Sequence, residues 1–134
     1  MRVSDFNRAA SESGQAMVEL GLLLPMLLVL VLAIVQFGII FNNYEIVTDA
    51  TRVGARQAIL LRLNGGLPST AETVVRNAAA SLNQSDLKVT ITAPSWTTPG
   101  SDVTVTAKYP YSINLLGWVV ANGSLTSVQV ERLE

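Results

Sequence analysis

The sequence predicts an α+β fold: a long N-terminal helix, a second, amphipathic helix and a small three-stranded antiparallel sheet. Three observations lead to this prediction. An uncharged apolar run extends from Leu20 to Phe41. A helical repeat of apolar residues follows this run and continues, after one loop, to about Asn83. From Leu87 onward apolar residues recur at every second position, as in half-buried strands.

The apolar run is long enough to cross a bilayer as one helix. From Leu20 to Phe41 a helix measures about 33 Å, against a hydrocarbon core of about 30 Å. The run does not end in the small-residue site of a cleaved secretory signal, so we expect it to stay attached. Pro25 lies inside it and removes one helical hydrogen bond. This proline has two interpretations: a tolerated kink, or a segment that unwinds locally when chains pack together.

The helical pattern continues beyond the apolar run, so that one helix from Leu20 to Arg62 would be about 65 Å long. Ala50, Gly54 and Ala58 place a small residue at every fourth position, which allows close approach of another element. This face is expected to pack either on the protein's own domain or on another subunit. The same stripe includes Tyr44, Val47 and Leu61.

The remainder predicts one more helix and the sheet. Ser69 and Glu72 fit a capping box at the start of the second helix. The strands are predicted at residues 87–93, 103–109 and 124–132, with Val128 and Val130 as the apolar side chains of the third. Residues 112–120 are unusually apolar for a connection. They are expected to form either a short helix or loop that covers the sheet, or an exposed surface for a partner subunit or the membrane interface.

Composition argues against several functional classes. The chain has 134 residues and a net charge of −1, and its nine basic residues form no stripe that would suggest nucleic acid. It contains no histidine and no cysteine, so the usual zinc ligands and most nucleophile–base pairs are missing. Asp86 and Asp102 are loop carboxylates that no nearby residue in the sequence would orient. We therefore expect no enzyme, no metal and no cofactor.

The junction before the apolar run carries the strongest functional signal. Gly14 stands immediately before the apolar segment, and Glu19 lies in its first turn. Placing an ionisable group at the edge of a membrane-length helix costs free energy, so chance is a poor explanation for Glu19. The pattern is typical of a prepilin-type processing and assembly signal.

With these residues in hand, the chain resembles the TadE-like family, pseudopilins of tight-adherence pilus systems. The resemblance rests on residues 14–20 followed by Leu24 and Pro25, on residues 36–56, and more weakly on the strand-rich C-terminus at residues 128–131. It implies a pilin-like fold and cleavage after Gly14 by a membrane-embedded prepilin peptidase. It also implies that Gln15 becomes the new N-terminus and that Glu19 and Pro25 then serve assembly with other pilin-like subunits and pilus assembly proteins.

Physical chemistry suggests what Glu19 does. The helix dipole favours a carboxylate near a helix N-terminus, and a new α-ammonium at Gln15 would lie one turn away. In a bundle the ammonium of one subunit could instead reach Glu19 of a neighbour and set the axial stagger. The simpler alternative is a carboxylate that reaches the lipid headgroups.

Leu20 occupies a position that is aromatic in the major pilins, which favours a minor subunit over a bulk filament subunit.

These inferences predict three parts: a cytoplasmic leader at residues 1–14, a transmembrane and stalk helix at 15–63, and a small extracytoplasmic domain at 64–134. The location implied is the bacterial inner membrane, with a single pass. Arg2 and Arg8 precede the span but Arg52 and Arg56 follow it, so charge alone barely decides the orientation. The alternative function is a single-span membrane protein whose small domain binds a ligand or receptor, and retention of Met1 in the mature product would favour it.

Overall fold

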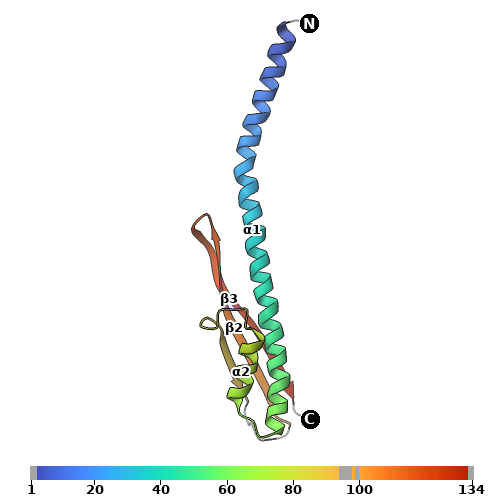
Figure 1. Cartoon of the computed structure of the whole chain (residues 1–134), viewed down its shortest axis with the longest axis vertical. Helices are drawn as coiled ribbons and strands as arrows, with labels where there is room; N and C mark the ends of the chain where they lie inside the picture. The colour runs from blue at the N-terminus through green and yellow to red at the C-terminus, as the bar shows by residue number, and fades with distance from the viewer. Residues whose placement is uncertain (1–2, 94–97, 99, 133–134) are drawn as a thin grey trace. The chain divides into compact units, whose positions relative to one another are not determined.

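The computed structural model of the chain confirms the α+β prediction (Figure 1). It describes residues 3–93, 98 and 100–132. Its contacts divide the chain into two compact units, Met1–Phe37 and Gly38–Glu134. The elements in chain order are α1 (Val3–Leu63), α2 (Pro68–Ala78), β1 (Lys88–Thr92), β2 (Asp102–Leu115) and β3 (Trp118–Arg132).

Helix α1 is continuous through the apolar run and into the second compact unit, and it remains helical at Pro25. The helix ends at Leu63, and two residues later Gly65 adopts a positive φ of 75°. The amide of Gly66 then donates to the carbonyl of Leu61 at 2.6 Å, and the side-chain amide of Asn64 donates to the Leu60 carbonyl at 2.9 Å. A glycine in the left-handed region just past a helix is the common way to satisfy its last carbonyls.

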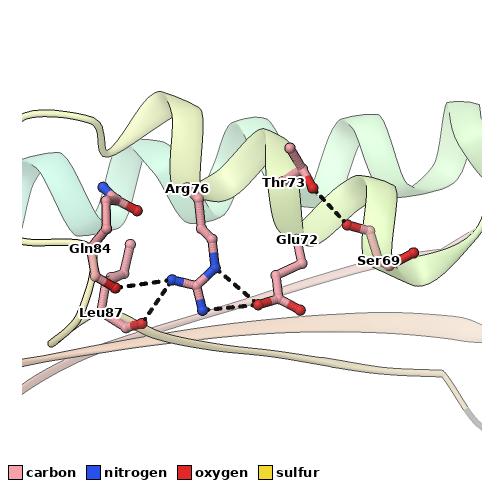
Figure 2. Close-up of polar contacts among 6 residues, drawn as sticks. All are labelled: Ser69, Glu72, Thr73, Arg76, Gln84 and Leu87. Carbon is pink, nitrogen blue, oxygen red and sulfur yellow. Dashed lines mark hydrogen bonds and ion pairs between the residues drawn. The ribbon is translucent and has the colours of Figure 1, made fainter.

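Helix α2 begins differently from the prediction. Its N-cap is Leu67, with extended backbone and no side-chain capping bond, and Pro68 occupies the first turn. The capping box at Ser69 and Glu72 was therefore wrong, because Pro68, with its fixed φ and missing N–H, takes the first helical position. Ser69 is already helical, and its carbonyl accepts a hydrogen bond from Thr73 Oγ1 at 3.0 Å (Figure 2).

The three strands form an antiparallel sheet in the order β1–β2–β3. Val103, Val105 and Ala107 of β2 point to the face that α1 and α2 cover, and all three are fully buried. Val128 and Val130 lie opposite Thr106 and Thr104, so they share the other face and are 54% and 51% exposed. The predicted third strand is thus present, but its two valines do not contribute to the buried core. A strand's faces alternate, and the register places its polar set inward.

Beyond the part of β2 that pairs with β1, strands β2 and β3 continue as a two-stranded hairpin that includes residues 112–120. The first expectation for this segment, a helix or loop covering the sheet, was wrong. Ile113, Trp118, Val119 and Val120 favour extended backbone, and Gly117 supplies the turn. A β-bulge interrupts the register between Ile113 and Asn114.

The core lies between the C-terminal half of α1, helix α2 and the inner face of the sheet. Small residues on α1 let the layers approach closely. The buried apolar residues of this core are Val47, Ala50, Ala55, Ala58, Ala71, Val75, Ala79, Leu82, Leu87, Val103, Val105 and Ala107.

Candidate functional site

The junction residues lie within α1 and are exposed to solvent. Gln15 and Glu19 are one helical turn apart, and Gln15 Nε2 donates a hydrogen bond to Glu19 Oε1 at 3.1 Å. The spacing of four residues brings both side chains to the same side of the helix. The geometry therefore places the side-chain amide of Gln15 within hydrogen-bond distance of the Glu19 carboxylate.

Gly14 is not explained by the packing of the chain itself. A Cβ built there would meet no atom of the described residues within 4 Å, and Gly14 is helical. Glycine inside a helix costs about 1 kcal/mol relative to alanine. The packing of the described chain therefore does not require glycine at this position.

The apolar half of α1 presents its side chains outward. Between Met17 and Phe41 most large apolar residues are more than half exposed, among them Leu22, Met26 and Phe37. The segment Gly14–Leu61 contains the single helix, among the described residues, that is long and apolar enough to cross a membrane. The chain thus has the organisation of a single-pass membrane protein with a C-terminal domain.

The small-residue face packs inside the second compact unit. Ala50, Gly54 and Ala58 are all buried. A Cβ on Gly54 would collide with Cγ2 of Val75 in α2 and lie 3.8 Å from Cγ1 of Val105 in β2. At Gly54, therefore, α1 approaches α2 so closely that a side chain would not fit. This geometry favours packing on the protein's own domain over packing on another subunit.

The exposed side of the same part of α1 is charged. Glu45, Asp49, Arg52 and Arg56 all face solvent, and Arg52 Nη1 lies 3.7 Å from Asp49 Oδ1. Asp49 and Arg52, three residues apart on the helix, thus form an ion pair. Between side chains this exposed, such a pair adds little stability.

Arg76 is a structural residue that the sequence did not single out (Figure 2). Its Nε and Nη2 contact Glu72 Oε1 at 3.0 and 2.9 Å, and its Nη1 donates to the carbonyls of Gln84 and Leu87 at 3.2 and 3.1 Å. The four-residue spacing from Glu72 could have predicted the ion pair. The carbonyl bonds could not be predicted, because they depend on how the chain turns after α2.

The two carboxylates that the sequence placed in loops differ in their surroundings, because Asp102 is the first residue of β2 whereas Asp86 lies between α2 and β1. The carboxylate of Asp102 accepts hydrogen bonds from Nε and Nη2 of Arg132 at 2.7 and 3.2 Å. These hydrogen bonds hold the pKa of Asp102 below its ordinary value and raise the pKa of Arg132. The expectation that nothing orients Asp102 was therefore wrong, since the β2–β3 register brings Arg132 directly opposite. Asp86 accepts hydrogen bonds from Asn83 Nδ2 at 2.8 Å and from Ser85 Oγ at 3.4 Å, so the same expectation was wrong for Asp86.

Both carboxylates lie at the surface, and their hydrogen-bond partners among the described residues are Arg132, Asn83 and Ser85. Within the part of the chain that the structure describes, no group of three or more acidic, histidine or cysteine residues could hold a metal ion. Asp102 and Asp86 hold strand and loop ends in place.

Comparison with known proteins identifies one similarity. Residues 14–56 match the model of the family described as TadE-like protein. The resemblance stated above is confirmed over this segment, which includes the junction, the apolar run and the small-residue face as far as Gly54. No curated protein and no solved structure is similar enough to the chain to count as a match.

Proposed function

We propose that this chain, whose residues 14–56 are TadE-like, is a minor pilin or pseudopilin of a tight-adherence, type IV-like pilus. A prepilin peptidase removes residues 1–14. The apolar helix anchors the product in the bacterial inner membrane, with the C-terminal domain outside the cytoplasm. Its work is non-covalent: it associates with pilin-like subunits and pilus assembly proteins, and it catalyses no reaction.

One observation carries this proposal: the family match begins at Gly14, a helical position where the packing of the described chain does not require glycine. A peptidase active site that closes around the backbone would supply the missing reason, because only glycine leaves room on both sides of the chain. The exposed apolar helix that follows provides the surface that a bundle of pilin-like helices needs.

Cleavage after Gly14 would change the chemistry around Glu19. In the uncleaved chain the Glu19 carboxylate accepts a hydrogen bond from the neutral amide of Gln15. Cleavage adds a charged α-ammonium to the same residue, one helical turn from Glu19. A charge-assisted pair of this kind is about twice as strong as a neutral hydrogen bond, and it offsets the cost of a carboxylate at the membrane edge. The same ammonium can serve Glu19 of a neighbouring subunit.

The processing step is tested by the intact mass of the protein from its native host. We expect a chain that begins at Gln15, and we expect Gly14→Leu to block cleavage. Gly21→Leu is the matched control, because Gly21 lies in the same helix and a Cβ there also meets no described atom within 4 Å. Cleavage that survives Gly14→Leu would refute this step. A product that retains Met1 would instead favour a single-span membrane protein whose domain binds a ligand or receptor.

The assembly role is tested with Glu19→Gln, which removes the charge and keeps the shape. We expect normal insertion and cleavage, because the carboxylate lies about one and a half helical turns from the scissile bond. Association with other pilin-like subunits, measured by crosslinking in the same cells, should fall. Glu45→Gln changes an exposed carboxylate on the same helix and should leave crosslinking unchanged. Normal crosslinking in Glu19→Gln would reduce Glu19 to a headgroup-seeking side chain.

A further inference from the structure

The end of the β2–β3 hairpin is apolar and exposed. We call residues 115–120 the hairpin tip. Leu116, Trp118, Val119 and Val120 are 69%, 81%, 59% and 62% exposed. The nearest charged residues in the chain are Lys108 on one side and Glu131 on the other. An uncharged, apolar tip of this kind is unusual on a protein surface that faces only water.

The turn at the tip places Leu116 in a backbone conformation that leucine disfavours. Leu116 and Gly117 both have positive φ, 52° and 90°, as in the type I′ turn of a two-residue hairpin. Asn, Asp or Gly normally occupies the first of these positions, because a side chain such as leucine is strained in the left-handed region. Since Leu116 is mostly exposed, its packing in the domain does not offset this strain. The reason for leucine therefore lies outside the folded domain.

Within the unit Gly38–Glu134, the tip lies at the end opposite the C-terminal end of α1. Within the unit Gly38–Glu134, Figure 1 shows the hairpin turn pointing away from the C-terminal end of α1, so that β2 runs antiparallel to α1. Val105 of β2 lies beside Gly54 of α1. From Val105 the strand extends about 33 Å to Leu115, whereas the helix needs only about 20 Å from Gly54 to Phe41.

We propose that the hairpin tip inserts into the interfacial layer of the same bilayer that α1 crosses. Phe41 is the last residue of the apolar run, and the strand is long enough to reach its level even after sheet twist shortens it. Leu116, at the turn, would lie deepest, at the acyl boundary, with Trp118 next to it among the headgroups, where its amphipathic ring is favoured. The domain would then touch the membrane at two points, the helix and the tip.

The distribution of the apolar residues favours lipid over a partner protein. Trp118 lies on the inner face with Leu115, whereas Val119 pairs with Asn114 on the outer face, and Leu116 lies at the turn itself. The tip is thus apolar on both faces, which suits immersion, whereas docking on a protein surface uses one face of a strand pair. Its tether to a membrane-spanning helix also keeps it close to lipid at all times. The proposal uses only the membrane span and does not depend on a role in a pilus.

The test uses the full chain in vesicles of phosphatidylethanolamine and phosphatidylglycerol. Trp96, which lies outside the described residues, is replaced by Phe so that Trp118 is the single tryptophan of the chain. We expect blue-shifted Trp118 emission that is quenched when the lipid acyl chains carry bromine. Leu116→Asn should reduce this quenching. Because asparagine suits the turn, amide hydrogen exchange in β2 should be no faster in Leu116→Asn.

Val128→Asn is the matched control, since Val128 is an exposed valine of β3 far from the tip, and it should leave quenching unchanged. Emission typical of tryptophan in water would overturn the proposal. Blue-shifted emission without quenching by brominated lipid would also overturn it, because Trp118 would then be buried against protein. Equal losses of quenching in Leu116→Asn and Val128→Asn would do the same, since the effect would not belong to the tip.

Discussion

Gly54 allows a direct test of how α1 joins its domain. The substitution Gly54→Ala adds one methyl group at the point where α1 meets α2. That group would collide with Cγ2 of Val75, which is fully buried. Valine is branched at Cβ and keeps a strongly preferred rotamer in a helix, so its side chain cannot simply turn away. Accommodating the methyl group therefore requires α1 and α2 to move apart.

The expected magnitude follows from two opposing effects. Overpacking a well-packed core costs about 1–3 kcal/mol. Alanine is a better helix former than glycine by about 1 kcal/mol, which offsets part of this cost. The net loss in the free energy of unfolding should thus be about 0–2 kcal/mol. Gly54→Leu has a similar propensity advantage but more atoms to place, so its loss should be larger.

A second substitution separates the collision from other effects. Val75→Ala alone removes buried methyl groups and should cost about 2–3 kcal/mol, because it leaves a cavity. In the double variant the methyl group that Gly54→Ala adds occupies part of that space. The two costs should therefore fail to add by about 1–2 kcal/mol. Amide hydrogen exchange of the β2 core, measured on the full chain in detergent, reports the free energy of domain opening.

Additive costs in the double variant would refute this reasoning, because the two side chains would then not share the same space. A different result would be as informative: unchanged domain stability in Gly54→Leu together with lost subunit association. That outcome would place the small-residue face between subunits, against the contacts described here.

Two further predictions concern polar contacts in the domain. Arg76→Lys should lower the free energy of unfolding by about 1–2 kcal/mol and speed amide exchange around Leu87, because lysine lacks the fork that reaches two carbonyls. Glu72→Gln removes only a half-exposed ion pair and should cost less than about 1 kcal/mol. Arg132→Gln should raise the pKa of Asp102 toward its ordinary value of 3.8, measured by NMR titration of the carboxyl group. Because folding lowers the pKa of Asp102, its pair with Arg132 stabilises the folded strand ends fully above pH 3.8. This contribution is lost as the pH falls through the lowered pKa. Arg132→Gln lacks the pair, so its stability should not show this loss.

The sequence was most predictive where one periodicity runs for a long distance. The apolar run and the small-residue repeat at Ala50, Gly54 and Ala58 predicted one continuous helix and the face that packs. The alternation at Val103, Val105 and Ala107 predicted the inner face of β2. In each case many residues indicate the same buried face, so a single exception has little effect on the prediction.

The prediction failed where one residue or one pairing decided the outcome. Pro68 shifted the start of α2 by taking the first helical position. The pattern around Val128 and Val130 is compatible with these valines on either face of the sheet, and only the pairing with β2 shows that they face outward. Arg132 meets Asp102 for the same reason. Strand register is a long-range property, so the local pattern of β3 could not determine it.

The faces of α1 indicate where subunit contacts can form. In the second compact unit the small-residue face, including Ala50 and Ala58, is already occupied by the protein's own domain. The exposed charged residues on the other side of this part of the helix would have to be desolvated in a tight helix bundle, which is costly. Between Met17 and Phe41, by contrast, α1 exposes apolar side chains that need a cover of lipid or protein. Association through α1 therefore belongs to its apolar half, which begins beside Glu19. Substitutions in that half should impair assembly without unfolding the domain, whereas substitutions such as Gly54→Leu should unfold the domain first.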